Sequence, residues 1–257
     1  MRVTVLGSGA SGGVPLVGGV WGACDPENPR NRRLRPSLLV ESEGTAILID
    51  TSPDLRAQLL ASSVSRLDAV LYTHAHADHV HGIDDLRALN CASGTAIPAF
   101  GSARTLAEVS DRFGYAFTRS EPPAKPGWHK PELAPQVIDG PFQVGRLAIE
   151  PFDQDHHVTV STGFRIGRFA YSTDVVRLDE AAFVALDGIE VWVVSCLREE
   201  PHPIHAHLEL VLSWIRRLRP RRAILTHMNH SMDYASLARK LPPGIEPGYD
   251  GLVLEIS

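Results

Sequence analysis

The sequence predicts a layered α/β protein with about a dozen strands in two sheets and helices packed against them. Three observations favour this class. Short apolar runs of strand type alternate with helical patterns in both halves of the chain. The 257 residues are 44% hydrophobic, which is enough to form a compact core. No linker-like segment or internal repeat interrupts the chain, so we expect a single domain over residues 1–257.

In the first half, strands are expected at residues 3–6, 37–40, 46–50 and 68–72, and helices at 53–62, 79–89 and 102–113. Residues 7–13 form a glycine-rich loop, and four prolines forbid a long helix across residues 14–36. The proline-rich segment 121–141 is expected to be a surface excursion.

In the second half, strands are expected at residues 147–151, 163–166, 169–172, 189–195, 222–226 and 252–256. Residues 207–218 carry apolar side chains at helical spacing, which indicates an amphipathic helix. A last helix is expected at residues 234–241. Strands and helices therefore alternate in this half as they do in the first.

The charge balance argues against a nucleic-acid partner. The formal net charge is −5, from 25 basic and 30 acidic residues, so a surplus of phosphate-neutralising charge is missing. The one dense basic run is Arg30, Arg32, Arg33 and Arg35, which fits either a solvated loop face or a phosphate-binding patch, and we favour the loop face.

The three cysteines, Cys24, Cys91 and Cys196, are far apart and form no CxxC pair, which fits a reducing cytoplasm better than a disulfide scaffold. We expect Cys91 and Cys196 to be small buried residues. The apolar run at residues 3–6 is too short for a signal peptide core or a membrane span, so a cytoplasmic protein without a membrane partner is expected.

The strongest motif is Thr73-His74-Ala75-His76-Ala77-Asp78-His79, which follows a predicted strand. Four side chains of metal-ligand type lie within six residues, and imidazole and carboxylate donors suit zinc, manganese or iron. Most of the twelve histidines cluster, here and at residues 156–157, 202–207 and 227–230. His81, on the following helix, is not expected to be a ligand. The pattern predicts a metal site at the end of a strand.

Gly7, Gly9 and Gly12 match a GxGxxG pattern after a strand. A dinucleotide site needs a helix directly after these glycines, and the prolines of residues 14–36 prevent one. We therefore interpret the glycines as a tight loop beside the metal site.

The HxHxDH motif resembles the metallo-β-lactamase superfamily, and further landmarks of that family follow in order along nearly the whole chain. The resemblance implies a four-layer αββα sandwich. It assigns Asp50 to orienting the histidine loop. It implies two metal sites bridged by Asp174, one with His74, His76 and His156, the other with Asp78, His79 and His227. His157 is the alternative to His156.

The resemblance also implies a mechanism with two divalent ions, zinc or manganese, and a metal-bridging hydroxide as nucleophile. With four positive charges from the ions and three negative ones from Asp78, Asp174 and hydroxide, the site favours a small anionic substrate such as a phosphodiester. Asp78 thus counts as a catalytic residue as well as a ligand.

A narrower resemblance is to the phosphodiesterase branch that includes the cyclic phosphodiesterase of the carbon–phosphorus lyase pathway. It rests on residues 7–15, 202–210 and 225–230. It implies a histidine general acid, His205 or alternatively His207, and suggests a homodimer. That enzyme's cysteine-rich structural zinc site is matched here only by Cys24 and His230, fewer than the four ligands such a site needs, so we do not expect it.

The leading functional hypothesis is therefore a phosphodiesterase that opens a small cyclic phosphate or a nucleotide-like ester. Three alternatives share the motif: tRNA 3′-end processing, hydrolysis of a lactone, thioester or β-lactam, and a non-catalytic accessory role in a cofactor pathway. The acidity of the chain, and the lack of a long inserted arm, count against tRNA processing.

Overall fold

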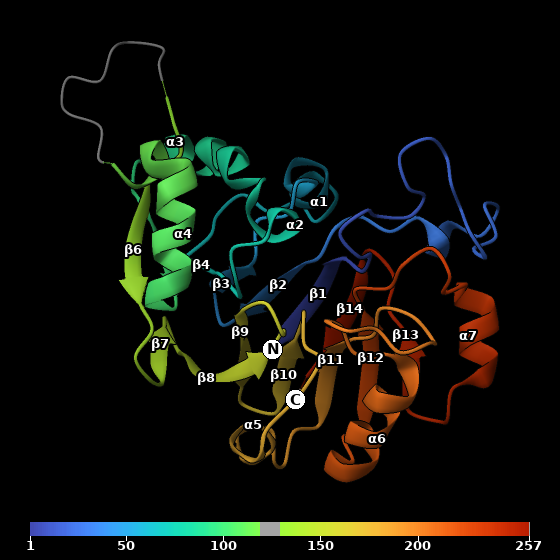
Figure 1. Ribbon diagram of the computed structural model, residues 1–257. Helices are drawn as coiled ribbons and strands as arrows, with labels where there is room; N and C mark the ends of the chain where they lie inside the picture. Colours follow the sequence, from blue (N-terminus) through green and yellow to red (C-terminus); the bar gives the residue numbers. More distant parts are fainter. Residues whose placement is uncertain (119–128, 257) are drawn as a thin grey trace.

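The computed structural model describes residues 1–118 and 129–256. It has two seven-stranded sheets packed face to face, with helices on both outer faces (Figure 1). This is the four-layer αββα sandwich that the resemblance implied.

The first sheet has the strand order β14-β1-β2-β3-β4-β5-β6. Strands β14, β1, β2 and β3 are antiparallel, and β3 to β6 are parallel. The strands are β14 (Leu252–Glu255), β1 (Arg2–Gly7), β2 (Ser37–Ser42), β3 (Thr45–Ile49), β4 (Ala69–Leu71), β5 (Ile97–Gly101) and β6 (Leu133–Val137). Helices α1 (Leu55–Ala61), α2 (Ala77–Val80), α3 (Arg87–Ser93) and α4 (Ala103–Phe113) accompany it, with the 3₁₀ turns η2 (Ile83–Leu86) and η3 (Gly114–Phe117).

The second sheet repeats this plan with the order β13-β12-β11-β10-β9-β8-β7. Strands β7 to β10 are antiparallel, and β10 to β13 are parallel. The strands are β7 (Phe142–Val144), β8 (Leu147–Asp155), β9 (Val160–Ile166), β10 (Phe169–Ser172), β11 (Val191–Ser195), β12 (Arg222–Thr226) and β13 (Ile245–Pro247). Its helices are α5 (Glu180–Ala185), α6 (Leu208–Leu218) and α7 (Tyr234–Lys240), and η1 (Pro29–Asn31) lies in the long N-terminal loop.

Alternation along the strands divides the apolar residues among three cores. In β3, Ile47 and Ile49 face the layer between the sheets, and Leu48 faces the helices of the first half. In β11, Val193 lies between the sheets and Trp192 packs against the helices of the second half. Because both faces of these strands are buried, they appear in the sequence as continuous apolar runs.

Two predicted elements differ from the structure. The helix expected at residues 79–89 is instead α2, η2 and part of α3. Gly82 interrupts it: a Cβ there would lie 1.9 Å from the carbonyl oxygen of Ser52, and the Gly82 N–H bonds Thr51. The excursion expected at residues 121–141 is wrong for residues 133–137, which form the edge strand β6, where Pro135 is tolerated. Residues 121–128 of it lie outside the described chain.

Strands β5, β7 and β13 and helix α5 were not predicted. Each is six residues or fewer, and β5, β7 and β13 lack a clear alternating pattern. Pairing with neighbouring strands stabilises β5, β7 and β13, although their own sequences do not indicate strands.

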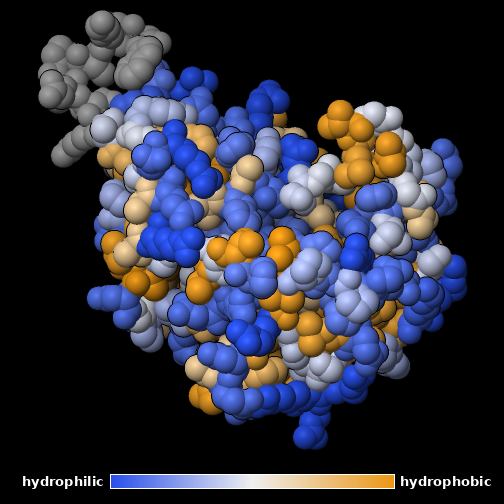
Figure 2. All heavy atoms as spheres, in the orientation of Figure 1, coloured by the Kyte–Doolittle hydropathy of each residue, from blue (hydrophilic) through white to orange (hydrophobic). Residues whose placement is uncertain are grey.

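The visible surface is mostly polar, with apolar atoms gathered on the protruding N-terminal loop at the upper right (Figure 2). Val17 and Val20 of that loop are exposed. Among the described residues, no helix combines the length and the apolar character that crossing a bilayer requires.

Candidate metal centre

The histidine motif occupies the turn between β4 and α2, at the carboxyl end of a parallel strand. His76 is the residue before α2, and Asp78 and His79 lie in its single turn. The Thr51 N–H donates to the His79 carbonyl and the Gly82 N–H to the Thr51 carbonyl, so the short helix is held against the segment after β3. This packing directs His74, Asp78 and His79 into the interior, where all three are buried.

The remaining donors come from the second half of the chain. His156 follows β8, Asp174 follows β10, and His227 follows β12. Asp174 and His227 have positive φ angles of 49° and 56°, and Asp50 after β3 has 63°. Such backbone costs on the order of 1–3 kcal/mol and persists where the surroundings impose it, commonly at functional sites.

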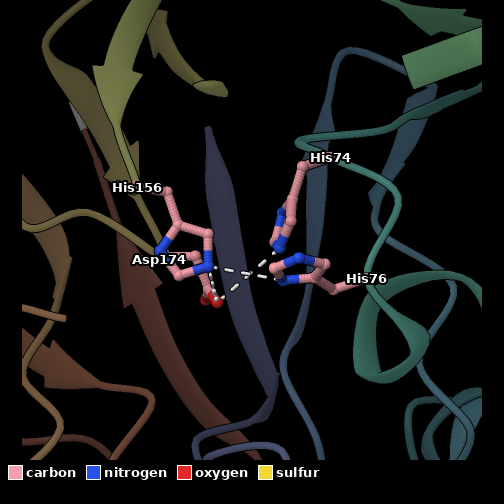
Figure 3. Close-up of side chains that lie close together, drawn as sticks. All are labelled: His74, His76, His156 and Asp174. Carbon is pink, nitrogen blue, oxygen red and sulfur yellow. Dashed lines mark hydrogen bonds and ion pairs between the residues drawn. The ribbon is translucent and has the colours of Figure 1, made fainter. Parts of the chain in front are cut away.

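The seven side chains form two donor groups that share Asp174. The first contains His74, His76, His156 and Asp174 (Figure 3). The second contains Asp78, His79, Asp174 and His227. Within each group, one ligand atom per residue lies within 4.8 Å of all the others.

The two oxygens of Asp174 are divided between the groups. Oδ2 lies 3.6 Å from His74 Nε2 and 3.4 Å from His156 Nε2. Oδ1 lies 3.2 Å from His79 Nε2 and 3.0 Å from His227 Nε2. A carboxylate placed in this way can bridge two cations.

The donor atoms fit a divalent metal. Zinc–nitrogen bonds of about 2.0–2.1 Å in a tetrahedron place neighbouring ligand atoms about 3.3 Å apart, close to the separations here. His74 Nε2 and His79 Nε2 are buried without a hydrogen-bond partner among the described residues, and both face the donor groups. A buried polar atom without a partner is costly, and a bound cation would satisfy both.

Asp50 holds the histidines in the tautomer that metal binding needs. His79 Nδ1 donates to Asp50 Oδ2 at 2.7 Å. His74 Nδ1 donates to Thr73 Oγ1 at 3.0 Å, and that hydroxyl donates to Asp50 Oδ2 at 2.8 Å. With the protons on Nδ1, the Nε2 lone pairs of His74 and His79 face the centre.

The electrostatics of the two groups differ. Burial, with the nearby His79, lowers the pKa of His74 well below its ordinary value, and burial lowers that of His156. Burial would also lower the pKa of His79, but Asp78, Asp174 and Asp50 raise it well above the ordinary value. The pKa of His227 is raised as well, because Asp174 and Asp78 outweigh burial. The second group therefore favours bound protons more than the first does, and a cation at Nε2 of His79 would displace such a proton.

The sequence profile of the β-lactamase superfamily domain matches residues 45–228, which include every donor of the two groups. The chain belongs to the metallo-β-lactamase superfamily. A solved structure of a diphosphatase from the PhnP family is 33% identical, with a TM-score of 0.89, over 100% of this chain and 98% of that one. Zn(2+)-bound PqqB from Methylobacterium extorquens has a TM-score of 0.78 over the whole of both chains at 20% identity, which supports the fold alone.

Two curated relatives match over different lengths. An octanoyltransferase of Porphyromonas gingivalis is 36% identical over 258 residues, covering 98% of this chain and 51% of that protein. A ribonuclease Z of Bradyrhizobium diazoefficiens is 50% identical over 60 residues, covering 23% of this chain and 20% of its own. The chain thus spans about half, or less, of the length of these two relatives.

In this metallo-β-lactamase fold, the structure distinguishes the alternatives that the sequence left open. His156 is buried and its Nδ1 donates to the Ile204 carbonyl at 2.8 Å, which turns Nε2 toward Asp174. His157 is exposed and belongs to neither donor group. The geometry therefore places His156 in the cluster.

His205 lies beside the centre, whereas His207 is the residue that precedes α6 and makes no side-chain cap there. His205 Nδ1 is buried without a hydrogen-bond partner among the described residues and lies 3.9 Å from Asp174 Oδ2. Its ring stacks on His227 with centroids 5.1 Å apart. Burial, with the neighbouring His227, lowers the pKa of His205 to about 3.

The glycine loop lies beside the centre, as interpreted from the sequence. Gly9 pairs with Met228, directly after His227, and the Ala10 N–H donates to the Met228 carbonyl. Ser8 is fixed in turn by Asp250, which accepts bonds from its N–H and hydroxyl.

The arginine run is neither a free basic patch nor a uniformly solvated face. Arg33 is 2% exposed and donates to the carbonyls of Met232 and Asn229. Arg30 lies over the ring of Tyr234, and Arg35 pairs with Asp54.

Two of the cysteine expectations concern burial, and one of them is wrong. Cys91 is exposed, because it lies on the outer side of the short helix α3, whereas Cys196 is buried as expected. Cys24 is buried with its sulfur 3.7 Å from Arg33 Nη1.

Sequence reasoning missed two residues that hold the ligands in place. Thr73 belongs to the motif, but no pattern in the sequence indicates its link to Asp50. Ile204 acts through its backbone carbonyl, so its side chain carried no signal.

Proposed function

We propose that this hydrolase cleaves small phosphodiesters, including cyclic phosphates, with two divalent ions, zinc or manganese, held by the two donor groups. The observation that carries the proposal is the division of Asp174 between the groups, one oxygen to each. Divalent ions bound there would act as Lewis acids and lower the pKa of water, which is the chemistry that phosphodiester hydrolysis needs.

The charge of the site supports an anionic substrate. The donor groups contain two carboxylates, Asp78 and Asp174, against four positive charges from two divalent ions. A phosphodiester anion would be attracted to the remaining positive charge. A neutral ester or lactone would be attracted less strongly by this positive charge.

The residues of the chain have separate roles in this proposal. Asp50 keeps protons on the Nδ1 atoms of His74 and His79, so their Nε2 atoms stay free to bind cations. His205 presents Nδ1 beside Asp174 and would donate a proton or a hydrogen bond to the departing oxygen. Its low pKa keeps the ring neutral in the free protein, so proton donation requires an anionic substrate beside it to raise that pKa.

The comparisons support phosphoryl chemistry. The PhnP-family structure, matched over nearly its whole length, is that of a diphosphatase. We therefore expect that the present chain also cleaves phosphorus–oxygen bonds in small molecules.

The test is hydrolysis of bis(p-nitrophenyl) phosphate by protein loaded with Mn²⁺ or Zn²⁺, followed by assays on 2′,3′-cyclic AMP and a nucleoside diphosphate. Asp78→Ala and His79→Ala serve as controls. Metal-dependent turnover that both controls lose supports the proposal. Binding of two metals without turnover on any phosphorus ester contradicts it and favours a thioester or lactone substrate, or an accessory role.

The ribonuclease Z match favours RNA as a second candidate substrate. An unprocessed tRNA with a 3′ extension is therefore included as an additional substrate. Cleavage of this RNA at rates above those on the small esters would replace the leading proposal.

A further inference from the structure

The five histidines of the donor groups are not supported equally. His74, His79 and His156 each donate their outer nitrogen to a neighbour, namely Thr73, Asp50 and Ile204. His227 makes no such bond within the described residues, but it is 1% exposed and followed by Met228, which pairs with the glycine loop.

His76 has neither kind of support. It is only partly buried, its Nδ1 faces His156 Nε2 at 3.3 Å, and no hydrogen bond of its outer nitrogen is found within the described residues. Its position therefore depends on the backbone of the loop that carries it. The His76 carbonyl accepts from the His79 N–H at 3.0 Å within the motif, and the preceding residue, Ala75, is held from outside the motif.

The end of helix α4 lies along this loop. Arg112 Nη1 donates to the carbonyl oxygen of Ala75, the residue between His74 and His76. The next residue, Phe113, packs its ring edge-on against His81, with centroids 5.7 Å apart. Tyr115 donates its hydroxyl to Asp84 at 2.9 Å. Three contacts thus join the end of α4 and η3 to the segment 75–84.

The helix that supplies these contacts is itself fixed. Leu106 and Val109 are buried on its inner side, and Ser102 caps its N-terminus by accepting from the Thr105 N–H. Arg112 is therefore presented from a packed element, and a charged donor to a carbonyl oxygen makes one of the stronger hydrogen bonds.

We propose that Arg112 is a positioning residue for His76, and that it sets the metal affinity of the first donor group. Without it, the Ala75 carbonyl loses its partner, and the backbone of the half-buried His76 keeps only the bond from the His79 N–H to its own carbonyl. Outer partners of ligands change metal affinity by about 10–100-fold when removed. The proposal rests on metal binding by this cluster, and does not require the phosphodiesterase activity.

Arg104→Ala provides a matched control. Arg104 lies on the same helix, pairs with Glu108 at 2.8 Å, and has a mostly exposed side chain, 62% accessible. Arg112 approaches the same Glu108 at 3.8 Å. Both substitutions replace an arginine by alanine on α4 and disturb Glu108, but only Arg112→Ala removes the bond to Ala75.

The experiment measures Zn²⁺ affinity of the metal-free full chain by competition with a chromogenic chelator, for wild type, Arg112→Ala, Arg112→Lys and Arg104→Ala. Circular dichroism melting verifies that each variant is folded. We expect Arg112→Ala to weaken one of two binding steps about tenfold or more, Arg112→Lys to restore part of it, and Arg104→Ala to stay within about twofold.

Cobalt(II) substitution gives a second readout, because the visible absorption of cobalt reports the number and geometry of its ligands. The Arg112→Ala spectrum should change for one of the two bound ions. Unchanged affinity and spectrum in Arg112→Ala, an equal loss in Arg104→Ala, or a wild-type chain that binds no metal would each overturn the proposal. Unchanged affinity with a raised KM for bis(p-nitrophenyl) phosphate would also overturn it, and would make Arg112 a substrate contact instead.

Discussion

The two donor groups share Asp174 but differ in burial and charge. The second group, with Asp78, His79 and His227, is buried throughout, has a second carboxylate of its own, and has Asp50 behind His79. The first group has only the shared carboxylate and includes the half-buried His76. Because of this difference in burial and charge, the second group should hold its cation more tightly at neutral pH and lose it more steeply in acid.

The largest effect is expected from Asp174→Ala, because it removes a ligand from both groups at once. We expect loss of both metals and a fall in activity of about 10³-fold, equivalent to the several kcal/mol that metal Lewis acidity supplies. Metal content after dialysis and turnover of bis(p-nitrophenyl) phosphate are the measurements. Asp153→Ala, which changes an exposed carboxylate on β8, is the control. Retention of either metal would show that Asp174 does not link the groups.

Loss of one metal tests whether the groups are separate. His76→Ala should leave one ion per chain in the second group, and His79→Ala should leave at most one, weakly bound, in the first. Each variant is expected to lose about 10²-fold or more in activity, because the remaining ion cannot replace its neighbour. Elemental analysis together with chelator competition gives the stoichiometry and affinity. Equal residual affinities in the two variants would contradict the difference in charge.

Asp50→Asn keeps the shape of the side chain but removes its charge. Asp50 Oδ2 accepts from His79 and from the Thr73 hydroxyl, and its Oδ1 accepts from the Thr73 N–H; an amide cannot accept at both of its ends. We expect about a 10–100-fold loss of metal affinity, greater in the second group because His79 contacts Asp50 directly. The two binding steps should be resolved by chelator competition. A uniform loss in both steps would show that Asp50 acts on the fold and not on His79.

The smallest expected effect is a difference between the two donor groups in how their metal affinity depends on pH. His79 and His227 have raised pKa values in the metal-free protein, so their protons must leave before a cation binds. The affinity of the second group should therefore fall as pH drops, about tenfold per unit for each displaced proton. His74 has a lowered pKa, so the first group should change less near neutral pH.

The raised pKa values of His79 and His227 should also make the stability of the metal-free protein depend on pH. A raised pKa in the folded state stabilises it while the imidazole is charged, and this contribution is fully present below the ordinary histidine pKa of about 6.5. The contribution from His79 and His227 is lost as pH rises through their folded pKa values. Thermal unfolding across pH 6 to 9, with and without Zn²⁺, measures it. A metal-free melting temperature that rises over this range would contradict the sign.

Much of the first half of the site could be predicted because its donors are contiguous. His74, His76, Asp78 and His79 lie within six residues after a strand, so local spacing identifies them. The second half was predicted only through family resemblance. His156, Asp174 and His227 are dispersed over 72 residues of sequence, and although histidines cluster at 156–157 and 227–230, no local spacing joins these three residues to one another. Strand order in the second sheet, not spacing, brings these three together.

Local sequence alone predicts the apolar runs that become buried strands, the amphipathic helix at residues 207–218, which the structure has at 208–218, and the motif that follows β4. These depend on neighbours in the chain, where periodicity and spacing act directly. Long-range contacts determine that residues 133–137 pair as an edge strand, that His156 rather than His157 faces Asp174, and that Arg33 is buried. They also place Arg112 on the Ala75 carbonyl. Each of these features depends on a partner at least 18 residues away in the sequence. Where the partner is a backbone carbonyl, as at Ala75, the type of the residue that accepts the bond gives no indication of it.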